Sequence, residues 1–422
     1  MPKSQRTTLP DWLTYLEQSH PKSIDLGLER VARVKDALGL IPHFPIITVA
    51  GTNGKGSTCA MLEAILRAAG YRVGCYTSPH LLRYNERVRI NGELATDAAL
   101  CQAFAAIEAA RGDISLTYFE FGTLAAMVCF MHAQLDVVVL EVGLGGRLDA
   151  VNIFDADCAI LTSVALDHMD YLGDTREAIG YEKAGVFRPG KPAICSEPEV
   201  PDSVREHARK IGADLQCVHS DFDFSVEPLQ WRFRGRRGER YALPYPALRG
   251  AYQLYNAAAC LAALDELKTQ LPVASQDIRQ GLHGVALPGR FQILPGQPTM
   301  ILDVAHNPHA ARALAANLKT MPPAGKTIAL FSMLADKDIS GVVSVMREQV
   351  DSWQVFPIHA VRGAATSQLM AVLAASGVAE SVQQFDSAAA AYYQACNIAG
   401  ENDKIVVFGS FYTVAEIMRL HV

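Results

Sequence analysis

The chain has no surplus of basic residues and no long apolar run. Lysine and arginine number 38 against 44 aspartates and glutamates, which gives a formal net charge of −6. Proteins that mainly bind nucleic acid or anionic membranes carry a strong basic balance or patch, so neither partner is expected. No apolar segment approaches the length that spans a bilayer. An anionic small molecule is still allowed as a ligand, because a local site can be positive on an acidic protein.

Cysteine pairing is also missing. The nine cysteines are scattered, their number is odd, and no C-x-x-C pair occurs. Disulfide frameworks and zinc sites are therefore not expected, and a reducing compartment fits. The N-terminal segment MPKSQRTTLPDWL has no apolar stretch after its basic residues, so it does not resemble a signal peptide. We expect a cytoplasmic protein.

The length and the pattern of the chain predict two α/β domains. The chain has 422 residues, more than one core usually organises, and half of them are apolar. Strand-like and helix-like segments alternate, which favours a mostly parallel, doubly wound sheet. The segment Leu-Pro-Gly-Arg at 287–290 indicates a boundary. We predict a larger domain over 1–287 with a small antiparallel part, and a smaller C-terminal Rossmann-like domain over 288–422.

Individual elements follow from β-branched runs, turn residues and caps. In the first domain we expect strands at 45–50, 71–77, 136–142 and 159–164, and helices at 57–69, 119–134 and 174–186. In the second domain we expect strands near 299–304, 326–332, 352–357, 381–385 and 404–409. Asp174 with Glu177 three residues later is typical of a capping box that opens a helix.

Residues 221–247 have a different pattern, which predicts an antiparallel hairpin. They contain the run RGRRGER at 234–240. A solvated hairpin turn is the favoured interpretation of this run, and a basic binding patch is the alternative.

A glycine-rich loop joins the first strand to the first helix of the alternating region. The segment Ala50–Ser57 reads AGTNGKGS, and such a loop can hold phosphate oxygens with its backbone N–H groups and the helix N-terminus. Lys55 would then reach the outer phosphates. The strict pattern G-x-x-x-x-G-K-[ST] is not met, since Val49 stands at its first glycine and Gly56 separates Lys55 from Ser57. A glycine-rich turn without a ligand is the alternative.

Oxygen and nitrogen ligands follow the ends of neighbouring predicted strands. Glu141 closes one strand, Ser78 follows another, and His168 comes after a third. Ligands of open parallel sheets bind at the carboxyl ends of the strands, and Mg²⁺ prefers hard oxygen donors. A lone histidine is more often a core or surface residue, and Lys183 by itself would be an ordinary solvated lysine, so these alternatives stay open.

Eight motifs occur in the order of one known family. They are AGTNGKGS at 50–57, TSPHL at 77–81, ERVRING at 86–92, EVGLGGRLDAVN at 141–152, LDHMD at 166–170, EKAGVF at 182–187, PGRFQ at 288–292 and DVAHNPHA at 303–310. Over nearly its whole length the chain resembles the folylpolyglutamate synthase and dihydrofolate synthase family, within the Mur ligase superfamily. The glycine between Lys55 and Ser57, and the SPHL segment, favour the folate branch. The segments 25–30 and 117–120 resemble the pterin-side segments of the bifunctional bacterial members.

The resemblance implies a role for each matching residue. The ATP phosphates are expected on Gly54, Lys55, Gly56 and Ser57, with further ATP contacts from Asn256, Arg290, Asp303 and the neighbouring His306. The metal ligands implied are Ser78, Glu141, His168 and Lys183, the last as a carbamylated lysine. The pteroate or folate pocket is expected at Ile24, Asp25, Leu26, Thr117, Tyr118, Phe119, Glu120, Leu148, Asp149 and Ala150. Lys55, Lys183 and His168 are the catalytic candidates.

The implied activity is an ATP-dependent ligation of L-glutamate to dihydropteroate and to folylmono- or polyglutamates. ATP phosphorylates the carboxylate, and the glutamate amine then attacks the acyl phosphate, so ADP and phosphate leave. Lys55 and two Mg²⁺ ions would neutralise the charge of the phosphoryl transfer. Closure of the second domain would keep water away from the intermediate. We expect a monomer whose partners are these small molecules.

Two rival functions remain. One is a Mur-type ligase that acts on a nucleotide-linked peptidoglycan precursor. The other is a non-catalytic nucleotide switch, which would need an N-K-x-D motif for reading the base. The nearest segment, Asp336-Lys337-Asp338, is not such a motif.

Overall fold

The computed structural model describes residues 7–22, 24–322, 325–360 and 362–421. The chain folds into two compact units. The first unit holds the chain up to Ala247 together with Leu254–Val285, and the second holds Leu248–Gln253 together with the chain from Ala286 onward. The functional domain boundary between residues 287 and 288 stays a prediction. Among the described residues, no helix combines the length and the apolar character that crossing a membrane requires.

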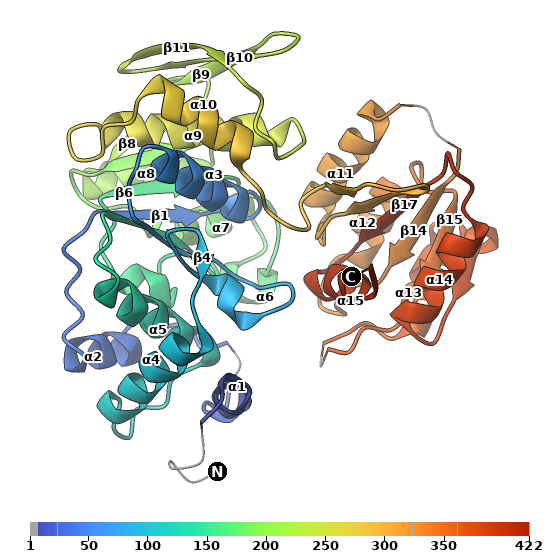
Figure 1. Ribbon diagram of the computed structural model, residues 1–422, viewed down its shortest axis with the longest axis horizontal. Coiled ribbons are helices and arrows are strands. Elements are labelled where there is room, and N and C mark those ends of the chain that lie inside the picture. The colour runs from blue at the N-terminus through green and yellow to red at the C-terminus, as the bar shows by residue number, and fades with distance from the viewer. Residues whose placement is uncertain (1–6, 23, 323–324, 361, 422) are drawn as a thin grey trace. The chain divides into compact units, whose positions relative to one another are not determined.

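The first unit is built on an eight-stranded sheet (Figure 1). The strand order is β4-β3-β2-β5-β1-β6-β7-β8, and the pairs from β2 to β8 are parallel while β3 and β4 form an antiparallel edge. The strands are β1 Ile46–Ala50, β2 Val73–Tyr76, β3 Val88–Ile90, β4 Glu93–Leu94, β5 Val137–Glu141, β6 Cys158–Leu161, β7 Pro192–Cys195 and β8 Asp214–Cys217. Strands β1, β5 and β6 are buried throughout, and apart from Thr48 and Glu141 their residues are apolar.

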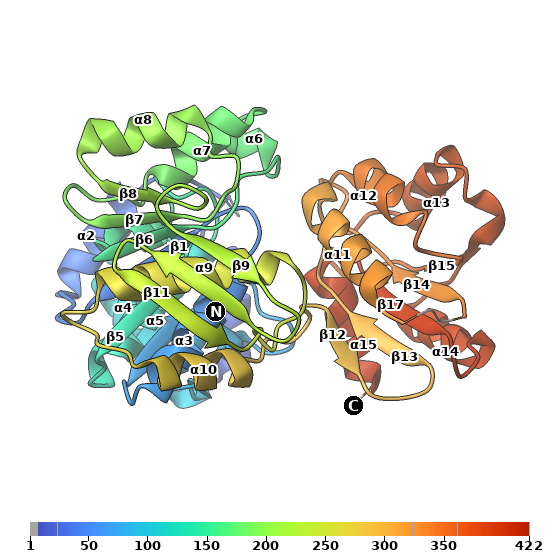
Figure 2. The ribbon, with the colours of Figure 1, turned by 90° about the horizontal axis from the view of Figure 1, so that it is seen from above.

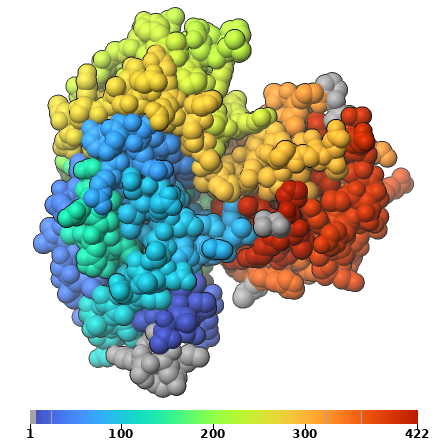
Figure 3. Space-filling model, in the orientation of Figure 1, coloured from blue at the N-terminus to red at the C-terminus, as the bar shows by residue number. Residues whose placement is uncertain are grey.

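Helices cover both faces of this sheet (Figure 1), as the predicted doubly wound fold requires. They are α1 Leu9–Gln18, α2 Glu29–Ala37, α3 Lys55–Ala68, α4 Asp97–Ala110, α5 Tyr118–His132, α6 Met169–Leu172, α7 Arg176–Ala184, α8 Asp202–Ile211, α9 Tyr252–Glu266 and α10 Ser275–Gly284, with the 3₁₀ turns η2 Tyr84–Arg87 and η3 Ala150–Ile153. Figure 3 shows side chains of the α9 and α10 segment, in yellow, meeting those of α3, in blue. The approach is close because Gly281 has no side chain: a Cβ there would lie 2.5 Å from Ile65 Cα.

The predicted antiparallel hairpin is present and gains a third strand. The order is β11-β10-β9, with β9 Asp223–Val226, β10 Trp231–Gly235 and β11 Gly238–Leu243 (Figure 2). The arginines at its turn form ion pairs with acidic residues of neighbouring segments. Arg236 pairs with Asp214 and Asp221 at 2.7 Å each, and Arg237 pairs with Glu266 at 2.5 Å. The turn is thus an ordinary, charge-paired hairpin turn.

The second unit has a six-stranded sheet in the order β12-β13-β17-β14-β15-β16. Its strands are β12 Gln292–Leu294, β13 Thr299–Leu302, β14 Thr327–Phe331, β15 Ser352–Val355, β16 Val382–Gln384 and β17 Lys404–Phe408. Its helices are α11 Pro308–Thr320, α12 Ile339–Met346, α13 Thr366–Ala375, α14 Ala388–Ile398 and α15 Phe411–His421, with the 3₁₀ turn η4 Ala379–Ser381. The five predicted strands are confirmed, whereas the antiparallel edge strand β12 was not predicted. Phe331, Trp353 and Phe408 form an aromatic cluster in its core.

The predicted capping box at Asp174 is wrong. The N-cap of α7 is Thr175, whose side chain accepts a hydrogen bond from the Ala178 N–H. Glu177 instead accepts from the backbone N–H groups of Asp202 and Ser203, where it holds the start of α8. Two adjacent residues, Asp174 and Thr175, could both cap this helix, and the structure uses the second.

Candidate active site

The glycine-rich loop lies between β1 and α3, as predicted. Gly54 is the N-cap of α3 and has φ +90°, a left-handed conformation that glycine adopts without strain. Asn256, on α9, lies directly beside this loop, because a Cβ on Gly54 would be 2.6 Å from Asn256 Oδ1. Gly56 and the buried Ser57 are in the first turn of α3. The loop therefore presents the N–H groups of a helix N-terminus, which is the arrangement that binds phosphate.

A segment after β6, at residues 162–165, fixes this loop. The Thr162 hydroxyl donates to Asn53 O at 2.7 Å, and the Ser163 hydroxyl accepts from Asn53 N–H at 3.0 Å. Thr52 Oγ1 accepts from Ala165 N–H at 3.0 Å and donates to Ala165 O at 3.1 Å. A Cβ on Gly51 would lie 1.9 Å from Thr162 Oγ1, so only glycine fits there. The sequence analysis did not single out this segment, because it placed Thr162 and Ser163 inside the predicted strand 159–164, whereas β6 ends at Leu161.

Two lysines converge on one carbonyl oxygen of the loop. Lys55 Nζ donates to Gly51 O at 3.0 Å and to Thr52 O at 3.1 Å, and Lys183 Nζ donates to Gly51 O at 3.1 Å. Lys183 comes from α7 and is only 4% exposed. Burial, together with the charge of Lys55, lowers the pKa of Lys183 to about 7. Lys183 is therefore a buried amine beside the loop rather than the solvated lysine of the alternative interpretation.

Glu141 and Ser78 lie together at the carboxyl edge of the sheet. Glu141 ends β5, is in register with Val49 of β1, and is buried. One of its oxygens, Oε2, accepts from Ser78 N–H at 2.9 Å. Ser78 precedes a cis peptide bond to Pro79. Two of the four predicted metal ligands are thus brought together next to the strand that carries the loop.

His168 is the N-cap of α6 and adopts φ +53°. Its Nε2 lies 3.9 Å from Asp167 Oδ1. In the part of the chain that the structure describes, no group of three or more His, Cys, Asp or Glu side chains could hold a metal ion. The predicted ligand set contains only two residues of those types. A metal here would therefore also need the Ser78 hydroxyl and an oxygen donor on Lys183.

The three segments predicted to line the pteroate pocket are joined by hydrogen bonds. The Gly27 N–H donates to Leu148 O at 3.4 Å, which links the segment of Ile24, Asp25 and Leu26 to that of Leu148 and Ala150. Arg30, which the sequence did not single out as a site residue, links Asp25 to Glu120. Thr117 and Glu120 form a capping box at the start of α5. The structure therefore brings all three segments into one region of the first unit.

Within this region, the Asp149 side chain stabilises a turn of the backbone. Its Oδ2 accepts from Leu144 N–H at 2.8 Å and its Oδ1 from Val151 N–H at 3.0 Å, so it closes the glycine-rich turn after β5 and caps η3. Burial raises its pKa to about 6. Phe119 packs against the same turn, since a Cβ on Gly143 would be 2.5 Å from its ring. Tyr118 lies beside the Arg87 guanidinium, which is 5.5 Å from its ring centroid.

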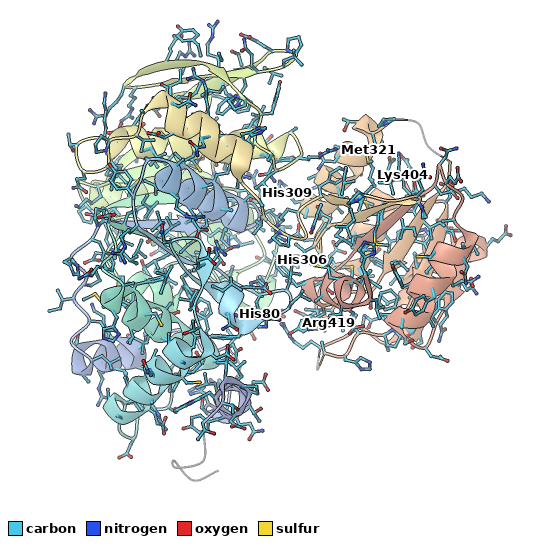
Figure 4. All side chains as sticks on the ribbon, viewed as in Figure 1. His80, His306, His309, Met321, Lys404 and Arg419 are labelled. Atoms are coloured by element: carbon cyan, nitrogen blue, oxygen red, sulfur yellow. The ribbon has the colours of Figure 1, made fainter. Side chains whose placement is uncertain are left out.

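The remaining predicted ATP residues form a cluster in the second unit. The Asp303 carboxylate accepts from Phe291 N–H at 2.9 Å and from Ala305 N–H at 2.8 Å, and burial raises its pKa. The Arg290 guanidinium lies 4.9 Å from the Phe411 ring centroid. His306 Nδ1 donates to Val304 O at 2.9 Å, since a carbonyl only accepts, so Nε2 carries no proton when the ring is neutral. Figure 4 labels His306 and His309, which lie just before and within the first turn of α11.

Comparisons with known proteins agree with this geometry. The family model of the Mur ligase middle domain matches residues 49–264, and that of the Mur ligase glutamate ligase domain matches residues 289–411. The dihydrofolate synthase/folylpolyglutamate synthase of Escherichia coli K12 is 50% identical over 413 residues, covering 98% of this chain and 95% of the relative.

Solved structures give the same result. Escherichia coli FolC in complex with DHPP and ADP has a TM-score of 0.94 at 49% identity and covers 99% of this chain and 98% of its own. A bifunctional folylpolyglutamate synthase/dihydrofolate synthase with Mn, AMPPNP and L-glutamate bound has a TM-score of 0.91 at 50% identity, with 99% of each chain covered. The chain belongs to the dihydrofolate synthase/folylpolyglutamate synthase family of Mur ligases.

Proposed function

We propose that the protein is an ATP-dependent ligase that joins L-glutamate to dihydropteroate and to folylmono- or polyglutamates. The observation that carries this proposal is the loop between β1 and α3, with Lys55 and Lys183 on the same carbonyl oxygen, in a chain of this family. Related structures contain DHPP, ADP, AMPPNP, Mn and L-glutamate, which are the classes of ligand that this reaction needs.

The proposed reaction has two steps. An oxygen of the acceptor carboxylate attacks the γ-phosphorus of ATP, the bond from that phosphorus to the β-phosphate oxygen breaks, and ADP leaves. The unprotonated amine of glutamate then attacks the acyl carbon, phosphate leaves, and the nitrogen loses a proton to give the amide. The N–H groups of the loop and the Lys55 ammonium bind the phosphates, and they act mainly by positioning and by neutralising charge.

A divalent metal is proposed at the edge of the sheet beside this loop. Glu141 and the Ser78 hydroxyl offer oxygen donors there, and His168 is the proposed nitrogen donor. When bound, Mg²⁺ would neutralise phosphate charge and polarise the transferred phosphoryl group. Two ions are proposed, by resemblance to the family.

Lys183 is proposed to be carbamylated. Its amine is buried beside the loop and has no carboxylate in hydrogen-bond range among the described residues, so a permanent ammonium would be poorly compensated. Attack of the neutral amine on CO₂ forms an N–C bond and releases one proton. The resulting carbamate carries a negative charge and two oxygen donors of the kind that Mg²⁺ prefers.

The other site assignments remain part of the proposal. Asn256, Arg290, Asp303 and His306 are proposed ATP residues. The pteroate pocket is proposed along the three joined segments, where Asp149 would shape the wall while its own oxygens cap the turn. A cytoplasmic location and a monomeric state are also proposed, with no nucleic acid or membrane as partner.

Substrate-dependent phosphate release tests the function. We expect release that requires both glutamate and either dihydropteroate or tetrahydrofolate, measured side by side at steady state. Nucleotide-linked peptidoglycan precursors should give no release above background. Release with these precursors alone would overturn the proposal in favour of a Mur-type ligase on cell-wall substrates.

A further inference from the structure

Arg30 joins two acidic residues that belong to different segments of the proposed pteroate pocket. Its Nη1 donates to Asp25 Oδ2 at 2.6 Å, and its Nη2 donates to Asp25 O at 2.7 Å and to Glu120 Oε1 at 3.1 Å. One guanidinium thus holds the carboxylate of Asp25, the backbone carbonyl of Asp25 and the carboxylate of Glu120. The side chain and the peptide of Asp25 are both fixed by this one group.

Glu120 is itself held in place, so it acts as the fixed end of this link. Its Oε2 accepts from Thr117 N–H at 2.7 Å, and the Thr117 hydroxyl accepts from Glu120 N–H at 3.2 Å. The Glu120 side chain is only 4% exposed. Moving Glu120 would break the hydrogen bonds in the first turn of α5. Arg30 therefore holds Asp25 at a fixed position relative to the start of that helix.

A second contact restrains Asp25 from the other side. His20 Nε2 lies 3.2 Å from Asp25 Oδ2, and His20 Nδ1 lies 3.0 Å from Ser115 Oγ. The carboxylate oxygen Oδ2 is therefore occupied by Arg30 and His20. The other oxygen, Oδ1, is bonded only to the exposed Lys22, at 3.4 Å, among the described residues. Oδ1 is left able to accept a hydrogen bond from a substrate.

The hydrogen bonds of Arg30 depend on the planar, forked shape of its guanidinium group. The three hydrogen bonds come from two separate nitrogens held in one plane, whereas a lysine ammonium would have to make them all from a single nitrogen on a flexible stem. The Arg30 Nε is buried and has no hydrogen-bond partner among the described residues. The guanidinium is thus placed so that its two terminal nitrogens bond the two acidic residues, while its Nε–H is left without a hydrogen bond among the described residues.

We propose that Arg30 is a positioning residue that fixes the Asp25 carboxylate for the pteroate end of the substrate and thereby sets the apparent affinity for dihydropteroate. The inference rests on the proposed function and on the place of Asp25 in the proposed pocket. A dihydropterin ring carries N–H donors along one edge, and a carboxylate with one available, fixed oxygen is a suitable acceptor for them. Turnover at saturation should depend little on Arg30, because the residue acts through Asp25 and not on the reacting atoms.

The first experiment compares Arg30→Lys with a matched control, Arg111→Lys. Arg111 makes an ion pair of the same class in the same unit, with its Nε 2.7 Å from Glu108 Oε2 and its Nη2 2.8 Å from Tyr15 OH. For Arg30→Lys we expect the KM for dihydropteroate to rise by at least about tenfold, with kcat within about twofold. Arg111→Lys should change neither constant, although both variants lose an arginine fork. Equal KM values for the two variants, or a loss confined to kcat, would overturn the inference.

A double-mutant cycle tests whether Arg30 acts through Asp25. In an Asp25→Asn background, Arg30→Lys should raise KM by much less than it does in the wild type, because the group that it positions is already altered. Independent, multiplicative effects of the two substitutions would contradict the inference. If the wild-type protein shows no dihydropteroate-dependent phosphate release, the proposed function is wrong. If the wild type releases phosphate but Arg30→Lys does not raise the KM for dihydropteroate, only the role of Arg30 is wrong.

Discussion

At the residue scale, Lys55 and Lys183 show how burial separates two side chains of one type. Both donate to Gly51 O, but Lys55 is the first residue of α3 and half-buried, whereas Lys183 is almost fully buried on α7. A half-buried lysine at a helix N-terminus is placed to meet an ATP phosphate. The buried Lys183 has a lowered pKa, so its amine is more easily unprotonated and better suited to form a carbamate.

Replacing Lys183 by alanine should leave the enzyme nearly inactive. The substitution removes the proposed carbamate oxygens beside the glycine-rich loop, and short carboxylic acids such as formate or acetate should partly restore phosphate release by occupying the space. Lys191→Ala is the control, because Lys191 is half exposed and pairs with Asp157, just before β6. Wild-type protein incubated with isotope-labelled bicarbonate should show a carbamate NMR signal that the alanine variant lacks. Full activity of Lys183→Ala would refute the carbamate.

The buried Asp149 predicts a specific pH dependence of stability. Its pKa is raised by burial from 3.8 to about 6, so the folded protein holds this proton more tightly than the unfolded chain does. The stabilisation is therefore fully present below about pH 4 and is lost as the pH rises through about 6, by up to about 3 kcal/mol for a pKa change of this size. The free energy of unfolding of the wild type, relative to Asp149→Asn, should fall between about pH 4 and 6 and then level off. A difference that does not vary with pH would show that the carboxyl is not desolvated as the structure indicates.

At the scale of elements, the two ends of α3 offer a matched pair of glycines. Gly54 opens the helix with φ +90°, and Gly70 follows it with φ +89°. Alanine at either position carries the same backbone strain, about 1–2 kcal/mol. Only at position 54 would the new Cβ also meet another residue, 2.6 Å from Asn256 Oδ1, whereas nothing among the described residues lies within 4 Å at position 70.

We therefore expect Gly54→Ala to abolish binding of an ATP analogue, while Gly70→Ala binds it with wild-type affinity. Titration calorimetry gives the two affinities, and denaturant unfolding checks that both variants are folded. Equal affinities for the two variants would mean that the loop does not hold phosphate in the way proposed.

Elements and loops were predictable where the signal is local. The strand before the loop and the helix after it follow from Val49, Gly54 and the apolar spacing of α3, and the place of Glu141 beside β1 follows from the rule that strand ends of a parallel sheet share one edge. The capping residue of α7 was missed by one position, because Asp174 and Thr175 are both good caps.

Links between distant segments were not predictable from one sequence. Arg30 and Glu120 are 90 residues apart, and Thr162 and Asn53 are 109 apart, so no local pattern joins them. Asp149 shows a second limit. The resemblance assigned it to the substrate, but only the structure reveals that both of its oxygens are used to cap a turn.

At the scale of the whole molecule, each unit has the parts of an independent folding domain. The first has its own eight-stranded sheet and the second its own six-stranded sheet, and each buries its own hydrophobic core. Chains of this kind commonly unfold in more than one step, because destabilising one core does not remove the contacts of the other.

Calorimetry on single core variants should separate the two units. Phe121 lies in the first core and Trp353 in the second, and both are fully buried. Replacing either by alanine should cost about 3–5 kcal/mol, which corresponds to a fall of about 10 °C in the melting temperature of the unit concerned. Trp353→Ala should lower one thermal transition and Phe121→Ala the other, while the control Tyr393→Ala, at a side chain 58% exposed, should move neither. A single transition that shifts as a whole with either core variant would show that the two units form one cooperative domain, and the predicted boundary between residues 287 and 288 would then have no energetic meaning.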